Sequence, residues 1–217
     1  MKKRIFFLSI ILSALSLPSL ADDPDNWEFW TRHSASTVLT EKIEFRISQQ
    51  FNMNSLMQSM YFHYSEAAVT YEFNRWFSST MVFRETFKYS GDKWITEPRP
   101  YINTTAEIEK NKWTLTFRNR MVFRYFRERH DYLRLREKLG VSYDIELDKI
   151  IITPFTSGDL WLDANRSRIE KYQQYAGIWI TPMEKLDVGL HYIGNWINLD
   201  PKWKWIHAYR LSLSVGL

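Results

Sequence analysis

The sequence contains no cysteine, which excludes a disulfide framework, thiol chemistry and a cysteine-bound zinc site. It has no Gly-rich phosphate loop and no nucleotide-binding motif. Beyond residue 21, no apolar run reaches the roughly 18 residues that a membrane-spanning helix needs. Its histidines, carboxylates and serines show no spacing typical of a metal site or a nucleophilic catalyst. The sequence therefore predicts no cofactor, no metal and no enzymatic centre.

The first 21 residues have the pattern of a cleaved export signal. Residues 2–4 are basic, residues 5–17 are apolar, and residues 19–21 form a small-residue cleavage site. Without this segment the chain keeps 26 basic against 25 acidic side chains, which gives no support to a nucleic-acid partner. An exported chain without disulfides fits the periplasm or the outer membrane of a bacterium.

Aromatic residues are abundant, with ten Trp, twelve Tyr and fourteen Phe. A membrane barrel displays such side chains on its outer face and at both lipid–water interfaces. Alternation with period two recurs along the chain and is clearest at 113–125, where apolar residues share one face and Thr and Arg the other. The predicted strands are 43–51, 58–73, 77–89, 101–109, 113–125, 133–143, 149–160, 168–180, 186–192 and 205–217.

The connections alternate in length, as they do in porin-type barrels. Tight turns are predicted near residues 74–75, 110–112, 144–149 and 181–185, and longer connections near 52–57, 90–98, 127–131, 160–167 and 195–203. By analogy with known barrels, the short set would be periplasmic and the long set external. Aromatic residues flank both ends, among them Trp94, Trp161, Trp196 and Trp203 on the side of the longer loops.

Residues 41–217 are therefore predicted to form an all-β, antiparallel up-and-down transmembrane β-barrel of about 10–12 strands. Ten strands follow residue 41, and residues 27–36 could supply an eleventh. An odd number would make the first and last strands parallel, whereas bacterial single-chain barrels normally have an even number. Residues 22–40 could therefore lie in the lumen, lie in the periplasm or form a first strand. The expected number of strands is ten or twelve.

The strongest candidate site is a basic ladder on two neighbouring strands. Arg118, Arg120 and Arg124 share one polar face, and the next strand carries three further cations. The predicted lumen-lining residues are Arg118, Arg120, Arg124, Arg134, Arg136, Lys138, Glu44, Arg46 and Glu107. Such cations attract anions in selective pores. We favour the alternative of an internal salt-bridge network, with Glu44 beside Arg46, Glu107 and Glu109 as candidate partners, because small barrels fill their lumen with side chains.

Three polar residues, Glu85, Asn119 and Glu137, interrupt the apolar faces. A hairpin centred on Glu128 would place Asn119 opposite Glu137. A lipid-facing catalytic group is one interpretation of these residues, as in outer-membrane phospholipases that use a Ser–His pair. We favour the other interpretation, in which a bulge turns the side chains inward or they lie near the interface.

The Arg-rich runs at residues 117–125 and 132–136 resemble the central hairpin of an uncharacterised bacterial outer-membrane barrel family, a domain of unknown function. Trp27, Trp30 and the loop at residues 97–100 are similar as well. The sequence departs from the family pattern at 149–160, which has only Asp159 where a Glu is expected. The resemblance implies a barrel in the outer membrane and no assigned activity.

Three functions follow as hypotheses. The first is a non-catalytic outer-membrane barrel, either a narrow porin-like channel or a structural protein with an Arg-rich lumen. The second is an outer-membrane lipid-modifying enzyme, and the third is a periplasmic ligand-binding barrel. We carry the first forward, with the lipid bilayer and the general barrel-assembly machinery as expected partners and an unidentified small solute.

Overall fold

The computed structural model describes residues 26–54, 57, 59–125, 131–199 and 202–217. The predicted export signal, residues 1–21, lies outside the described residues. The alternating sequence forms strands β1 (Trp27–Thr40), β2 (Ile43–Asn54), β3 (Met60–Asn74), β4 (Phe77–Ser90), β5 (Lys93–Pro98), β6 (Tyr101–Lys110), β7 (Trp113–Arg124), β8 (Tyr132–Tyr143), β9 (Ile145–Leu147), β10 (Ile150–Asp163), β11 (Arg168–Met183), β12 (Leu186–Asn198) and β13 (Trp203–Gly216). No helix in the described ranges is long and apolar enough to cross a membrane.

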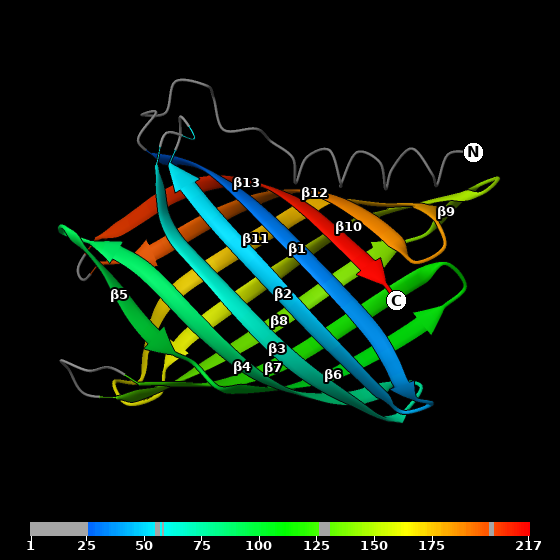
Figure 1. Ribbon diagram of the computed structural model, residues 1–217, viewed down its shortest axis with the longest axis horizontal. Coiled ribbons are helices and arrows are strands. Elements are labelled where there is room, and N and C mark those ends of the chain that lie inside the picture. Colours follow the sequence, from blue (N-terminus) through cyan, green and yellow to red (C-terminus); the bar gives the residue numbers. More distant parts are fainter. Residues whose placement is uncertain (1–25, 55–56, 58, 126–130, 200–201) are drawn as a thin grey trace.

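Eleven of these strands close into a ring, which confirms the predicted all-β barrel (Figure 1). The short β5 lies off the ring on the end of β4, and β9 lies off it on the end of β10. Neighbouring ring strands are antiparallel, except that β1 pairs with β13 in parallel. In Figure 1 these two strands run side by side with their arrowheads pointing the same way. The barrel is therefore mixed, with one parallel seam.

The odd strand number differs from the expected even number. Residues 27–40 form the first ring strand, which is joined to β2 by a tight turn at 41–42. Each hairpin reverses the chain direction, so the first and last of eleven strands meet pointing the same way. Their pairing runs from Trp27 opposite His207 to Ser36 opposite Gly216. It occupies the backbone groups that two open edges would leave unpaired.

Tight turns gather at one end of the barrel, called the turn end, and the longer connections at the other, called the loop end (Figure 1). The tight turns of the ring are at residues 41–42, 75–76, 111–112, 148–149 and 184–185. The four predicted tight turns are confirmed, although strand bounds differ by a few residues. Glu128, the expected centre of the β7–β8 hairpin, lies outside the described residues.

The two faces of the ring have opposite polarity. Along β4, Met81 points outward and is 67% exposed, whereas its neighbour Thr80 is buried inside. Along β7, Phe117 is exposed on the outside, whereas Arg120 is only 8% exposed in the lumen. Successive side chains of a strand point to opposite faces, so the alternation in sequence produces this separation directly.

Aromatic side chains cluster at both ends of the barrel. At the turn end, the rings of Phe73 and Phe77 lie 5.4 Å apart. At the loop end, the rings of Trp196 and Trp205 lie 3.5 Å apart. Trp161, which was expected on the outside among the loop-end aromatics, lines the lumen instead. It has the same parity as Asp159 and therefore shares the inward face of β10.

Two small apolar clusters occupy parts of the lumen wall. One consists of Trp30, Tyr175, Ile193 and Ala208, and the other of Ala68, Val82, Tyr101 and Val122. The space between them is bordered mainly by polar and charged side chains, which form the candidate site.

Candidate functional site

Two cavities lie in the lumen among the described residues. The loop-side cavity has a volume of about 420 Å³ and extends to Lys171. The turn-side cavity has a volume of about 430 Å³ and is lined by Glu44 and Glu107. Arg118 and Lys138 line both cavities. These two side chains therefore stand at the boundary between the cavities, where a path along the lumen would have to pass.

The six basic residues of the ladder lie on the inner faces of β7 and β8. The register places Arg120 opposite Arg136 and Arg118 opposite Lys138. Like charges at directly opposed positions repel each other. The hairpin therefore needs negative charge from elsewhere, either from other strands or from a bound group.

Carboxylates neutralise the loop-end half of the ladder. Arg124 donates to the two oxygens of Glu97 at 2.5 and 2.7 Å, and Arg134 donates to Glu170 at 2.5 Å. Glu97 belongs to β5, off the ring. Burial alone would raise its pKa, but hydrogen bonds from Arg124 and Arg99 hold that pKa at about 2.

A third ion pair joins Arg136 to Asp159, whose side chain is 1% exposed. Of the partners expected from the sequence, Glu44 pairs with Arg46, whereas Glu107 and Glu109 pair with none of the six ladder cations among the described residues. Glu107 accepts a hydrogen bond from Thr116 at 3.3 Å, and Glu109 is exposed near the turn end. The carboxylates that do pair come from β5, β10 and β11, outside the β7–β8 hairpin, and alternation within a strand does not show which carboxylate reaches which arginine.

The turn-end half of the ladder has no carboxylate partner in the described part of the chain. Arg120 Nε donates to Asn103 Oδ1 at 2.6 Å. The Nζ atom of Lys138 lies 5.3 Å from the centre of the Tyr175 ring. Arg118 makes neither a hydrogen bond nor an ion pair with the described side chains. The salt-bridge interpretation thus fits one half of the ladder, and an anion-attracting surface fits the other.

Glu66 on β3 is a second centre of charge, which sequence reasoning missed. Its side chain is 4% exposed and bridges Arg32 of β1 and Arg84 of β4, each at 2.7–2.8 Å. Ser48 and Tyr101 donate to the same carboxylate at 2.7 and 2.8 Å. One carboxylate therefore ties four neighbouring strands and β6 together. Its only signal in the sequence is a carboxylate at the centre of a strand with irregular alternation.

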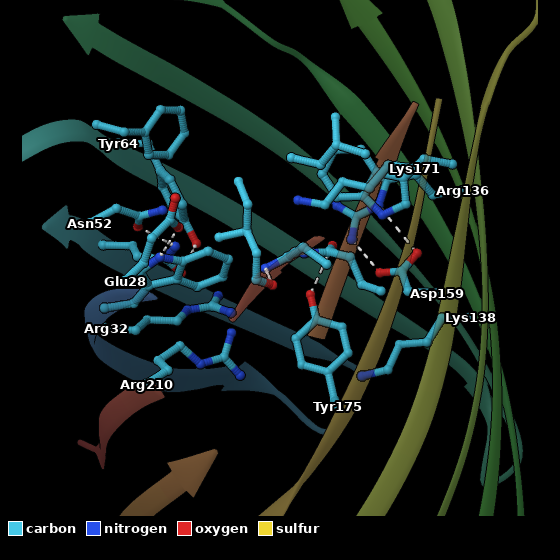
Figure 2. A pocket seen from close by; sticks show the side chains of 18 of the residues that line it. Glu28, Arg32, Asn52, Tyr64, Arg136, Lys138, Asp159, Lys171, Tyr175 and Arg210 are labelled. Atoms are coloured by element: carbon cyan, nitrogen blue, oxygen red, sulfur yellow. Dashed lines mark hydrogen bonds and ion pairs between the residues drawn. The ribbon is translucent and has the colours of Figure 1, made fainter. Parts of the chain in front are cut away.

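Positive charge exceeds negative charge around the loop-side cavity. Nine basic residues line it: Arg32, Arg84, Arg99, Arg118, Arg120, Arg136, Lys138, Lys171 and Arg210. Glu28 and Asp159 also line it, and Glu66 and Glu97 bind its arginines. Nine cations against four carboxylates leave an excess of five positive charges. Figure 2 shows cations on both walls of this cavity, three of them around the carboxylate of Asp159.

The remaining predicted residues line the turn-side cavity. Glu44 and Arg46 form an ion pair at 3.8 Å, with their side chains 35% and 37% exposed. Because water reaches this pair, it contributes little to stability. Glu107, on β6, lines the same cavity.

A polar row crosses the apolar outer face. The register aligns His33, Gln49, Ser65 and Glu85 on β1 to β4, beneath a shallow groove of about 720 Å³. Ser65 lies beside Glu85, but Gln49 separates it from His33 by two strand spacings, about 10 Å. A nucleophile and its base need contact near 3 Å. The row therefore lacks the Ser–His contact of a hydrolase.

Asn119 and Glu137 lie directly opposite each other and are hydrogen-bonded, as the hairpin register predicted. They face outward, because their neighbours in sequence line the lumen. The expected bulge is absent from the β7–β8 pairing, which runs without a register shift. Among the described residues, no group of three or more His, Asp or Glu side chains is placed to hold a metal ion.

The fold and the lumen define a class of protein: a closed β-barrel with an apolar exterior and a positively charged interior. The chain belongs to a family of proteins of unknown function (DUF2490), which matches residues 27–205. This match extends from β1 into β13 and confirms the resemblance to a domain of unknown function seen in the Arg-rich hairpin. No curated protein matches the chain.

Proposed function

We propose that this protein is an integral outer-membrane β-barrel whose lumen forms a narrow, anion-selective path. The proposal rests on the polarity of the two faces of the barrel, because the outer face is apolar and the interior is charged, the reverse of a water-soluble protein. Apolar side chains such as Met81 and Phe83 are more than half exposed, whereas the arginines are inside. In water, exposed apolar area costs about 25 cal/mol per Å². A bilayer removes this cost, and charged side chains then face the lumen as they do in membrane barrels.

Strand length supports the same location. The ring strands contain ten to sixteen residues. A tilted strand needs about 9–11 residues to cross the hydrocarbon layer. The aromatic clusters at both ends match the two interfacial girdles of such barrels. Export through a cleaved signal and insertion by the general barrel-assembly machinery belong to the proposal.

The charge around the lumen supports selectivity for anions. Arg118 and Lys138 border both cavities and have no carboxylate partner among the described residues. Rings of cations favour anions in pores. The paired arginines and the Glu66 network occupy the remaining cross-section. The expected conductance is accordingly low.

The membrane location is tested by expressing the full chain with its leader in a bacterium and fractionating the envelope. We expect the protein in the outer membrane, with a mobility in detergent gels that changes on boiling. A monomer that stays soluble without detergent would refute the location and favour a periplasmic binding barrel.

The path is tested in planar bilayers under a salt gradient. We expect small single-channel current steps and a reversal potential whose sign shows that anions are more permeant than cations. The double variant Arg118→Gln with Lys138→Gln should shift that potential in the direction that indicates weaker selectivity for anions. Lys149→Gln, which removes a cation at a turn-end hairpin, is the control. A wild-type barrel that inserts but carries no current would refute the path and leave a structural barrel.

A further inference from the structure

Residues that line the loop-side cavity carry hydrogen-bond donors that the protein leaves unsatisfied. Trp161 Nε1 and Arg210 Nε are buried without a hydrogen-bond partner, and both residues line this cavity. Arg118, Lys138 and Lys171 line it without a carboxylate partner among the described residues. These groups are all donors, and none of them can accept a hydrogen bond. The cavity is therefore matched to a ligand rich in acceptor atoms.

The cations without an ion pair among the described residues lie around the Asp159–Arg136 pair. Arg118 and Lys138 are directly opposed on β7 and β8, and Lys138 is opposite Asp159 on β10. Lys171 on β11 is opposite Trp161, and its Nζ lies 5.0 Å from the centre of the indole ring. Figure 2 shows Lys138 and Lys171 on either side of Asp159 and Arg136. A bound anion would relieve the repulsion among these cations.

The cavity is larger than an inorganic anion requires. Its volume of about 420 Å³ falls within the range of sites for small organic molecules. A further part of its wall carries Gln50, Asn52 and Tyr64. Tyr64 donates to Gln50 Oε1 at 3.1 Å, and Gln50 donates to Asn52 Oδ1 at 2.8 Å. Amide and phenol groups both donate and accept, as sugar hydroxyls do.

We propose that the loop-side cavity binds a small hydroxylated organic anion, namely a monosaccharide that carries a carboxylate or a phosphate. The anionic group lies among Arg118, Lys138 and Lys171, and the hydroxyl groups face the amides of Gln50 and Asn52. This site deepens the proposed anion-selective lumen and rests on its charge, but it does not require that the ligand crosses the barrel.

The test is calorimetric titration of the folded, detergent-solubilised barrel with four probes: glucuronate, glucose 6-phosphate, inorganic phosphate and glucose. We expect both sugar anions to bind, inorganic phosphate to bind more weakly and glucose not to bind. If only glucuronate or only glucose 6-phosphate binds, the result identifies the anionic group of the ligand as a carboxylate or a phosphate, respectively. If neither sugar anion binds, the proposal is wrong. If inorganic phosphate binds as tightly as glucose 6-phosphate, or if glucose binds as well, the hydroxylated anion is refuted as the ligand class.

The variants Lys138→Gln and Lys171→Gln test the placement of the ligand. Loss of one charged contact should weaken binding of the sugar anion at least about tenfold. Each variant should also raise the melting temperature of the ligand-free barrel, because the loss of a buried charge and of its repulsion by neighbouring cations outweighs the loss of its contact with an aromatic ring. Lys149→Gln is the matched control and should change neither quantity. Variants that bind like the wild type, or that lose binding together with stability, would overturn the site.

The outcome is separable from that of the proposed path. Titration in detergent reports binding whether or not the barrel conducts. Binding of a sugar anion without any current would support the binding site and refute the proposed conducting path. Current without binding of either sugar anion removes the site and leaves the path.

Discussion

Glu66→Gln should destabilise the barrel more than any neutralisation of an exposed carboxylate. The Glu66 side chain is 4% exposed and accepts hydrogen bonds from Arg32, Arg84, Ser48 and Tyr101. A glutamine keeps one acceptor oxygen and adds two donors, which would point at two guanidinium groups. The substitution therefore removes the counter-charge and introduces competing donors in one step.

The expected loss is about 3 kcal/mol of unfolding free energy. Removal of one partner from a buried ion pair costs about 3–5 kcal/mol, because the remaining charge stays buried. The Arg32 side chain is 30% exposed and can recover water, whereas that of Arg84 is 13% exposed and cannot do so as well. These exposures place the loss at the lower end of the range.

The measurement is reversible urea unfolding of the barrel in lipid vesicles, with linear extrapolation to zero denaturant. Glu44→Gln is the matched control, since it breaks an ion pair whose side chains are 35% and 37% exposed. We expect about 0.5 kcal/mol or less for that control. Similar losses for the two variants, or a loss below about 1 kcal/mol for Glu66→Gln, would refute the role of Glu66 as the charge centre of this wall.

Three further results are expected. Gly177→Ala should sharply lower the yield of folded barrel in detergent gels, because its added Cβ would overlap the backbone carbonyl of Leu190 on β12. Gly91→Ala is the control: its Cβ meets open space, and the left-handed backbone at Gly91 (φ +70°) should cost only about 1–2 kcal/mol, so this variant should still fold. Replacing Asn119 and Glu137 together by Leu should raise stability in vesicles by about 1–3 kcal/mol, since both face outward; a loss would argue against lipid contact. The lowered pKa of Glu97 means that its ion pairs stabilise the folded state above the usual pKa of 4.5. That stabilisation is lost as the pH falls toward about 2, and Glu97→Gln should flatten the pH dependence of the urea midpoint over this window.

Local features of the sequence were sufficient to predict most of the barrel wall. Alternation located the strands, and a hairpin assumed to be centred on Glu128 correctly set Asn119 against Glu137. A register shift within a regular hairpin would move every side chain to the other face, so the pattern determines the pairing. The parallel seam between β1 and β13 was not predictable in this way. It depends on which edges meet after ten hairpin steps, and no local signal records that closure.

The partners of the ladder show the same limit. The six basic residues of the ladder could be assigned to the lumen from their alternating positions along the two strands alone. Their carboxylates could not, because Glu97 and Glu170 lie in segments far from the hairpin in sequence. Trp161 was assigned to an outer girdle because it is aromatic and near a loop, although its parity with Asp159 pointed inward. Side-chain chemistry was a poorer guide there than position along the strand.

In the proposed membrane location, the parallel seam also determines on which side of the bilayer each end of the chain emerges. β1 begins at the loop end and β13 finishes at the turn end. In an even-stranded barrel both ends would share one compartment, whereas here an epitope placed just before Trp27 and another placed after Leu217 would report opposite compartments. If the barrel spans the outer membrane as proposed, the start of β1 has to cross the bilayer before its backbone can pair with β13. Sealing of the barrel then depends on translocation of that end as well as on strand pairing.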